Sequence, residues 1–399
     1  MPTGNLLSIL KKIRQDGPQT RRELADYLEL SFSMVSKLTG RLLERGLVKE
    51  IARPEGALGR PSDVLALDPT AAYAIGLDIE TYHQRAVLVN LLGDVVYSLE
   101  ESRTLPPSRD GILADLHRLI QQVCHCPDGQ VRLYGLGVGL WGSVDPQEGV
   151  IYSWTEAPEL YDVWKNFGLR AALRERYPFP HIHADDVVRS MGLAEVLYGA
   201  DQTKRDFIYA LADNGVGVAL MVNGVPYVGP AQLSGEIGHI PIGGTKPCNC
   251  GNIGCLETLC SANAVLEEAH RRLHEMMIPS SLRDIPAPLS VESVIAAAEA
   301  GDKLAYQLMV DAGEKFGIGL AIVANLFGPR RIVVGGSLAA STVYLDAARR
   351  IVRLQALAKV TGELHIVATQ LDRFAGARGA ASQVLNALFD ANELNILAL

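Results

Sequence analysis

Three cysteines and a histidine lie within one short stretch of the chain, and together they could bind a metal ion. The cysteines are Cys248, Cys250 and Cys255, and His239 precedes them. Three thiolates and one imidazole complete the tetrahedral shell of Zn²⁺ and leave no position open for a substrate, which is typical of a structural site. The redox motif Cys-x-x-Cys is absent, and a Cys-x-Cys pair is poorly placed for a disulfide. The spacing therefore predicts one structural zinc ion per chain.

The first 62 residues are basic, whereas the remainder of the chain is acidic. They contain 11 lysines and arginines against 7 aspartates and glutamates, although the whole chain of 399 residues has a net charge of −8. Apolar residues at helical spacing predict a first helix that ends at Gly17. Thr20 followed by Glu23 has the form of a capping box, so we expect a second helix to begin there.

A third helix is predicted immediately before Gly46. On one face of it we expect buried side chains, namely Met34, Val35, Leu38 and Leu42. The opposite face carries small polar and cationic residues, namely Ser33, Ser36, Lys37, Gly40 and Arg41. Residues 47–67 predict two short strands around a tip rich in proline and glycine.

Three helices followed by a β-ribbon predict a winged helix-turn-helix domain at residues 1–68. Serine fits closely into a major groove, and lysine or arginine reaches guanine or phosphate. The predicted DNA contacts on the third helix are Ser33, Ser36, Lys37 and Arg41. Arg53 and Arg60 flank the tip of the wing, where they could contact phosphate or enter a minor groove. The alternative is a helical protein-interaction domain with a solvated basic face.

The acidic remainder predicts an α/β fold with an internal duplication. Strand signals at residues 72–101, followed by a helix and a further strand, are repeated from residue 206 onward. This pattern is typical of the two-lobed sugar-kinase/actin-like (ribonuclease H-like) architecture. We expect a first lobe at 69–188 and a second lobe, containing the zinc site, at 189–378. A C-terminal helix at 379–399 is a candidate to complete the first lobe.

A glycine pattern at residues 137–142 matches Gly-x-Gly-x-x-Gly but does not predict dinucleotide binding. In a Rossmann fold a helix opens at this motif so that its N-terminus holds the pyrophosphate. Here a turn and a further strand follow instead. Tight glycine turns at a cleft edge are the simpler interpretation.

The cysteine cluster resembles the signature of the ROK family (repressors, open reading frames, kinases). "GEIGH" at residues 235–239 and "CNCGNIGCLE" at residues 248–257 are similar to the family pattern ExGH followed by CxCGxxGCxE. With its basic N-terminal domain, the chain resembles the repressor branch, which includes sugar repressors. The resemblance implies that the four cluster residues bind zinc. It also implies that Glu236, His239 and Glu257 border a sugar site.

The same resemblance implies a carboxylate pair and a glycine at the sugar site. Kinases of the family carry an acidic base in an Asn-Asp pair, and Asp185 and Asp186 take that place here. Asp186 would be a vestigial base, would hold sugar hydroxyls, or would cap a helix. Trp141 and Gly142 replace the family's proline-glycine at the cleft. Trp141 could stack on a sugar ring or simply belong to the core.

Both phosphate-binding loops depart from the kinase pattern, so we expect neither ATP binding nor catalysis. Glu80 and Tyr82 stand where the first loop has small residues that cradle phosphate through backbone N–H groups. Asp213 brings a second carboxylate into the other loop. A negative charge at each phosphate position opposes polyphosphate binding, and Tyr82 would fill the space of the phosphate.

Taken together, these features predict a sugar-responsive transcriptional repressor. Its partners would be operator DNA and a sugar or sugar phosphate, and it would act as a homodimer or homotetramer because half-sites match protein symmetry. No apolar run reaches the roughly 18 residues that a membrane span needs, so we expect no membrane insertion and a cytoplasmic location. The alternatives are a regulator controlled by a protein partner and an active sugar kinase.

Overall fold

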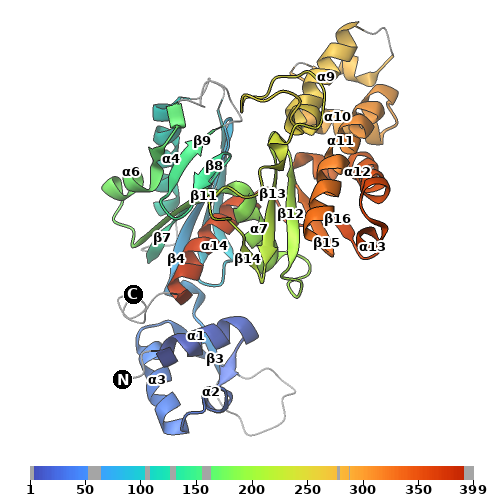
Figure 1. Ribbon diagram of the computed structural model, residues 1–399. Coiled ribbons are helices and arrows are strands. Elements are labelled where there is room, and N and C mark those ends of the chain that lie inside the picture. The colour runs from blue at the N-terminus through green and yellow to red at the C-terminus, as the bar shows by residue number, and fades with distance from the viewer. Residues whose placement is uncertain are drawn as a thin grey trace.

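The computed structural model describes residues 4–52, 64–103, 108–125, 132–154, 163–275, 279–286 and 288–390. They form a small N-terminal domain and two larger lobes, each of which is built on a five-stranded sheet (Figure 1). No helix among these residues has the length and apolar character needed to cross a membrane.

The N-terminal domain contains three helices and a small antiparallel sheet. The helices are α1 (Gly4–Asp16), α2 (Arg21–Leu28) and α3 (Phe32–Glu44), and the sheet has the order β1 (Gln19–Thr20), β3 (Val64–Leu67), β2 (Val48–Ile51). The predicted capping box is present, because the Thr20 hydroxyl accepts from the Glu23 N–H and the Glu23 carboxylate accepts from the Thr20 N–H. The tip between β2 and β3 lies outside the described residues, and so do Arg53 and Arg60.

The buried face of α3 differs from the prediction at one residue. Val35, Leu38 and Leu42 are buried as expected, but 40% of Met34 is exposed, and Thr39 is buried in its place. At about 100° per residue, Met34 and Thr39 flank the arc of the buried apolar residues on opposite sides, so the packing around the helix decides which of the two is buried. Burial of Thr39 is tolerated because its hydroxyl donates to the Ser36 carbonyl at 3.2 Å and accepts from Arg21 Nε at 3.2 Å.

The two lobes have the same strand topology, which confirms the predicted duplication. Each central strand pairs antiparallel with the next strand in the chain and parallel with a later one. The first sheet has the order β11 (His181–Asp186), β7 (Leu133–Leu140), β4 (Tyr73–Ile79), β5 (His83–Asn90), β6 (Val95–Ser102). The second has the order β14 (Val225–Pro226), β13 (Val216–Val222), β12 (Phe207–Ala212), β15 (Arg331–Gly335), β16 (His365–Ala368).

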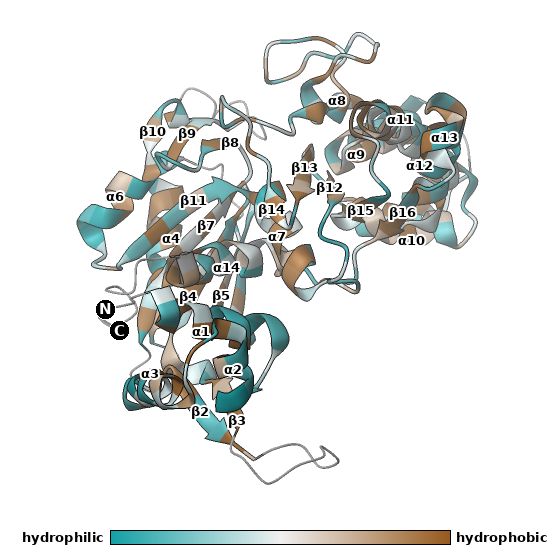
Figure 2. Ribbon diagram, turned by 60° about the horizontal axis from the view of Figure 1, so that its bottom comes forward, coloured by the Kyte–Doolittle hydropathy of each residue, from teal (hydrophilic) through white to brown (hydrophobic). Residues whose placement is uncertain are grey.

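Helices cover the outer face of each sheet. α4 (Arg109–Cys124) packs on the first sheet, beside α6 (Leu169–Arg176) and a small sheet of β8 (Ser143–Asp145), β9 (Val150–Ser153) and β10 (Phe167–Gly168). The second sheet is covered by α9 (Ala262–Glu275), α10 (Val291–Glu299), α11 (Lys303–Phe327) and α12 (Thr342–Gln355). Apolar residues follow the strands of this sheet, as is clear along β13 (Figure 2).

Two helices lie between the sheets. α7 (Val187–Tyr198) and α14 (Ala375–Asp390) pack against each other, α14 on β4 and β7 and α7 on β12 and β13 (Figure 1). α14 starts earlier than the C-terminal helix that we expected at residues 379–399. Residues 391–399 lie outside the described part of the chain. Because both helices lie between the lobes, a change in the angle between the lobes would shift them relative to each other.

Glycines in the first sheet allow α14 to approach closely. A Cβ at Gly76 would lie 1.9 Å from the Ala377 carbonyl oxygen, and one at Gly137 would lie 1.9 Å from the Ala380 carbonyl oxygen. Such distances exclude any side chain there. The first glycine of the Gly-x-Gly-x-x-Gly pattern thus serves helix packing inside β7.

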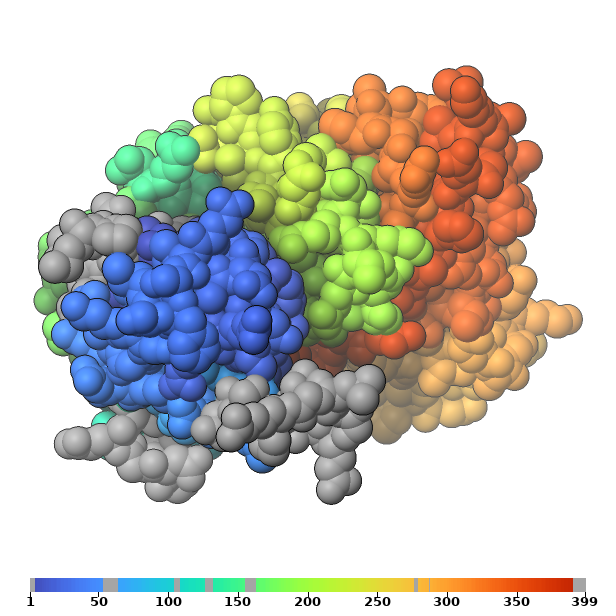
Figure 3. Space-filling model, turned by 90° about the horizontal axis from the view of Figure 1, so that it is seen from below, coloured from blue at the N-terminus to red at the C-terminus, as the bar shows by residue number. Residues whose placement is uncertain are grey.

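The N-terminal domain and the first lobe share one apolar core, which α14 completes. Leu6, Ile9 and Ile13 of α1 belong to the same cluster of buried side chains as Leu385 and Phe389 of α14. Seen from below, the N-terminal domain forms a broad surface nearest the viewer (Figure 3).

Candidate metal centre and interlobe pocket

The predicted metal ligands converge on one point. His239 ends the short helix η2 (Ile237–His239), and Cys255 lies just before α8 (Glu257–Cys260). One ligand atom from each of His239, Cys248, Cys250 and Cys255 lies within 4.8 Å of the other three. His239 Nδ1 is 3.6 Å from Cys248 Sγ, and Cys250 Sγ is 3.7 Å from Cys255 Sγ.

These distances fit a tetrahedral zinc shell. With Zn–S near 2.3 Å and Zn–N near 2.0–2.1 Å, the edges of a tetrahedron measure about 3.6 Å for N···S and about 3.8 Å for S···S. Burial and then the neighbouring thiols raise the pKa of Cys255 to about 12, so without a cation this thiol stays protonated. A metal ion would displace the proton and hold the sulfur as thiolate. The residues therefore suit a metal ion in both geometry and chemistry.

A tight loop brings the sulfurs together. The Cys248 N–H donates to the Asn252 carbonyl at 2.8 Å, and Gly251 has a φ of +94°. Gly254 has a φ of +71°, and a Cβ there would lie 2.4 Å from the Gly243 carbonyl oxygen. Only glycine adopts this conformation in so little space. Of the other described cysteines, Cys260 is fully buried and Cys124 is half-buried, and neither belongs to the cluster.

A cavity of about 580 Å³, open to solvent, lies between the lobes and borders the metal centre. Both lobes and the N-terminus of α7 supply its walls. Five of the predicted sugar-site residues line it, namely Gly142, Asp186, Glu236, His239 and Glu257. A cleft with a few convergent polar groups is the usual form of a small-molecule site.

His239 links the metal centre to the pocket. Its Nδ1 faces Cys248, while its Nε2 lies 3.9 Å from Glu236 Oε2. Across the cleft, the Ser143 hydroxyl donates to Glu236 Oε1 at 3.0 Å. Glu257 accepts from the Val216 N–H at 3.1 Å, and burial raises its pKa. A metal ion on Nδ1 would thus orient the imidazole that forms one wall of the pocket.

Asp186 caps α7 and also faces the pocket. Its Oδ1 accepts from the backbone N–H groups of Val188 at 2.6 Å and Arg189 at 3.2 Å. Burial raises the pKa of Asp186 to about 7, against the lowering effect of the nearby Arg189 charge, and Glu236 adds to the rise. Asp186 is thus a helix cap with a second oxygen available to the pocket.

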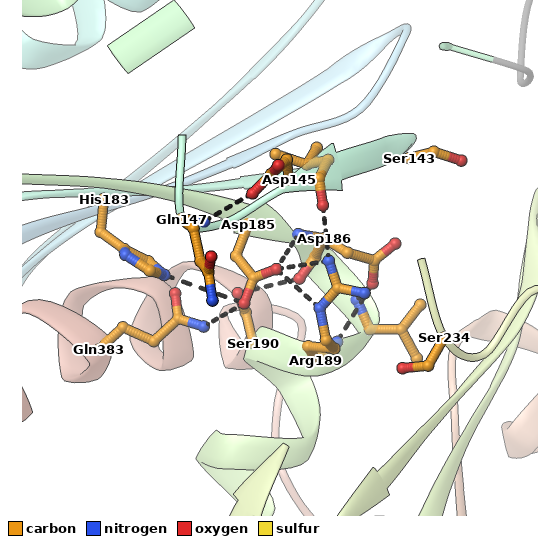
Figure 4. A network of polar contacts seen from close by, with 12 residues as sticks. Ser143, Asp145, Gln147, His183, Asp185, Asp186, Arg189, Ser190, Ser234 and Gln383 are labelled. Carbon is orange, nitrogen blue, oxygen red and sulfur yellow. Dashed lines mark hydrogen bonds and ion pairs between the residues drawn. The ribbon is translucent and has the colours of Figure 1, made fainter. Parts of the chain in front are cut away.

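Asp185 lies behind the pocket and not in its lining. Its Oδ1 accepts from Arg189 Nε at 2.7 Å, and its Oδ2 accepts from the Gln383 amide at 2.8 Å (Figure 4). Burial would raise the pKa of Asp185, but His183 and Arg189 more than compensate, so its pKa is lowered. The structure therefore does not place Asp185 where it could bind a sugar in the pocket; Asp185 holds the backbone N–H of Asp186 at 2.7 Å instead.

Three residues of this region were missed in the sequence. Ser143, Arg189 and Gln383 each bond one of the predicted carboxylates. Arg189 stands four residues after Asp185 on the turn into α7, a spacing at which opposite charges meet, so it could have been found. Ser143 and Gln383 come from distant segments and carried no local signal.

Trp141 belongs to the core and to the pocket wall. Only 6% of its surface is exposed, and its Nε1 donates to Asp78 Oδ1 at 2.9 Å. It borders the 580 Å³ pocket and also a second, wider cavity of about 2210 Å³ on the other side. Burial raises the pKa of Asp78 to about 6.

Residues from both segments that we expected to be altered phosphate loops line the wider cavity. Glu80 and Asp213 line it, and Glu80 is buried. Asp213 is bonded to the segment that follows β15, because its carboxylate accepts from the Ser337 N–H at 2.7 Å and the Ser337 hydroxyl at 3.0 Å. Tyr82 does not fill the phosphate space as we expected, since 44% of it is exposed and it does not line this cavity.

The predicted DNA contacts of α3 lie on its outer side. Ser33, Lys37 and Arg41 are exposed, and Ser36 is half-buried. The helix starts at the N-cap Ser31, whose hydroxyl accepts from the Met34 N–H at 3.3 Å.

Two duplicated lobes around a polar cavity, with a Cys₃His cluster at its edge, define a sugar-kinase-like body with a candidate metal centre. Residues 74–387 match the sequence model of the ROK family, and the chain belongs to that family. It is 31% identical over 395 residues to the N-acetylglucosamine repressor of Escherichia coli O6:H1, and the match covers 97% of this chain and 93% of the repressor. The resemblance inferred from the cysteine signature is thus confirmed.

Two solved structures show how far the likeness extends. A ROK family transcriptional regulator, described as a homologue of the E. coli Mlc protein, superimposes with a TM-score of 0.83 at 26% identity, over 100% of this chain and 99% of that one. The ROK family glucokinase of Streptomyces griseus, solved with glucose and AMPPNP, gives a TM-score of 0.69 at 23% identity over 78% of this chain and 98% of that chain. The regulator is therefore matched along the whole chain, and the kinase shares the fold of the body.

Proposed function

We propose that this protein is a sugar-responsive, DNA-binding transcriptional repressor. The observation that carries the proposal is a pocket with the carboxylates of Asp186, Glu236 and Glu257 in a chain whose N-terminal domain presents Ser33, Lys37 and Arg41. Carboxylates accept hydrogen bonds from several hydroxyl groups at once, as sugars require. Relatives named as sugar repressors support this function.

The N-terminal domain acts as a winged helix-turn-helix at residues 1–68, with α3 in the major groove of operator DNA. Arg53 and Arg60 would contribute wing contacts. The body comprises lobes at 69–188 and 189–378, with α14 serving the first lobe. Operator symmetry calls for a homodimer or homotetramer, and contact with the chromosome places the protein in the cytoplasm.

The metal is Zn²⁺, one per chain, held by His239, Cys248, Cys250 and Cys255. With four protein ligands it has no open position, so its role is structural. When bound, it fixes the loop that carries the pocket wall and orients His239 toward Glu236.

The protein binds its sugar without phosphorylating it. Glu80 and Asp213 put negative charge on the side where a kinase holds polyphosphate, and Asp213 is already engaged by Ser337. Solved relatives that are kinases share the fold, but the first loop of this chain lacks the small residues that cradle phosphate, and the second carries the carboxylate of Asp213. Asp186 is then a binding residue and a helix cap in the position of a former base.

Release of operator DNA by a free sugar tests this function. The full-length chain is mixed with an operator duplex, and a panel of sugars and sugar phosphates is screened for loss of the complex in a gel-shift assay. We expect one compound to release the DNA and to raise the thermal midpoint. Release only by a protein fraction of a cell extract would favour control by a protein partner. Sugar phosphorylation that depends on ATP and disappears in Asp186→Asn would show a kinase.

A further inference from the structure

Two large apolar side chains are exposed in the first turn of α3. Phe32 is 60% exposed and Met34 is 40% exposed, although both belong to a domain whose other large apolar side chains in α1 and α3 are mostly buried. Each exposed side chain forgoes part of the free energy that its burial would provide. An apolar pair held in solvent at this point is suited to contact a partner.

The two side chains frame the polar face of the helix. Successive residues are rotated by about 100°, so Phe32 and Met34 lie on either side of the exposed Ser33. Lys37 follows one turn later on the same polar face. The first turn of a recognition helix is the part that reaches base edges, whereas cationic residues further along contact phosphate.

The major groove offers one apolar group on the bases, the C5 methyl of thymine. We propose that Phe32 and Met34 contact thymine methyl groups and so restrict each operator half-site to thymine at those positions. The inference rests on the proposed function, and it deepens that function by naming what sequence feature the domain selects. Lys37 and Arg41 would contact phosphate and so contribute equally to the binding of every DNA sequence.

A third exposed aromatic residue provides a matched control. Tyr27 is 51% exposed but lies on α2, and Lys12 Nζ is placed 4.4 Å from its ring centroid. Tyr27 is therefore engaged within the domain and does not belong to the first turn of α3. Its substitution should leave base selection unchanged.

Deoxyuridine tests the contact because it differs from thymidine only by this methyl group. The full-length chain first selects its preferred duplex from a random pool, and single thymines of one half-site are then replaced by deoxyuridine. We expect wild-type protein to lose about fourfold in affinity for each contacted methyl, the equivalent of one buried methyl or methylene group. Phe32→Ser and Met34→Ser should each bind the thymine and the deoxyuridine duplex equally well at one position. Tyr27→Ser should still lose affinity for deoxyuridine at both positions.

Equal binding of the thymine and deoxyuridine duplexes by wild-type protein would overturn the inference. So would a loss that persists unchanged in the Phe32→Ser/Met34→Ser double variant. Both side chains are already exposed, so the variants should unfold at nearly the wild-type temperature. Selection of no duplex at all would instead show, at the first step, that the proposed function fails.

Discussion

The side-chain amide of Gln383 donates to Asp185 Oδ2 at 2.8 Å, and it thereby connects α14 to the residue that supports the pocket carboxylate Asp186. Three residues further along α14, Asn386 accepts from the Arg14 guanidinium of α1 at 2.6 Å. Arg14 also lies over the ring of Phe389, 4.2 Å from its centroid. α14 thus contacts Asp185, which supports the pocket carboxylate, and it also contacts the N-terminal domain.

Gln383→Ala should weaken the coupling between sugar and DNA. The pocket lining stays intact, so we expect the dissociation constant of the sugar in the absence of DNA to change by about twofold or less. Typical coupling free energies of 1–3 kcal/mol correspond to a 5–150-fold effect of one ligand on the other. The measurement is the factor by which saturating sugar weakens operator binding, and it should fall toward one.

Gln307→Ala is the control for this coupling. Gln307 also donates to an aspartate, Asp311, at 2.6 Å, but on the exposed side of α11. Its removal should leave the factor at the wild-type value. An equal loss of coupling in both variants would argue against α14 as the connection.

Asp186→Asn should stabilise the protein at alkaline pH. The pKa of Asp186 is about 7 in the folded chain, above the value near 3.9 in an unfolded one. The folded state therefore binds the proton more tightly, and the stability present below pH 4 is lost as the pH rises through 7. Asparagine keeps an oxygen for the helix cap. We expect its free energy of unfolding to exceed that of wild type by about 1–2 kcal/mol at pH 8, with a smaller difference at pH 5.

Asp186→Ala separates the effect of the charge on stability from the effect of the helix cap. It removes the acceptor for the Val188 and Arg189 N–H groups and should cost about 1 kcal/mol of cap stabilisation relative to asparagine at either pH. Urea unfolding at the two pH values measures both effects. Identical pH dependence in wild type and Asp186→Asn would contradict the assignment.

Cys250→Ser should abolish zinc binding. Cys250 is partly exposed, so its substitution leaves no core cavity, yet a three-ligand site holds the ion far less tightly. We expect one zinc per wild-type chain and none in the variant by elemental analysis, together with a lower thermal midpoint and weaker sugar binding. Cys124→Ser, outside the cluster, should retain the metal. A variant at Cys250 with full metal content and an unchanged pocket would refute the ligand set.

Lys37→Ala and Arg41→Ala should each weaken DNA binding similarly for every sequence. Phosphate contacts release counterions, so removing one lowers the slope of log K against log salt concentration by about one. Titrations of the operator and of an unrelated duplex at several salt concentrations measure this slope. Lys315→Ala, on the exposed surface of α11, should have no effect. A change in base preference instead of slope would assign these residues to base contacts.

The sequence alone was sufficient wherever the deciding interactions are local. The residues of the candidate metal centre lie within a short segment from His239 to Cys255, and their types already indicate a metal site. The capping box of Thr20 and Glu23 spans a single helical turn. Repeated strand patterns predicted the duplicated lobes because alternation and turn signals are properties of neighbouring residues.

Tertiary structure decided which side chains face the pocket and which support it. Asp185 and Asp186 are adjacent and chemically identical, yet only Asp186 faces the cavity. The carboxylate of Asp185 accepts hydrogen bonds from Arg189 and from Gln383, which is 198 residues away, and these bonds hold it behind the pocket. Tyr82 and Met34 turned outward for a similar reason, since burial depends on what packs against a residue. Local patterns identify residue types and spacing, but the closing of long loops brings distant groups together, and that contact is formed only in the folded chain.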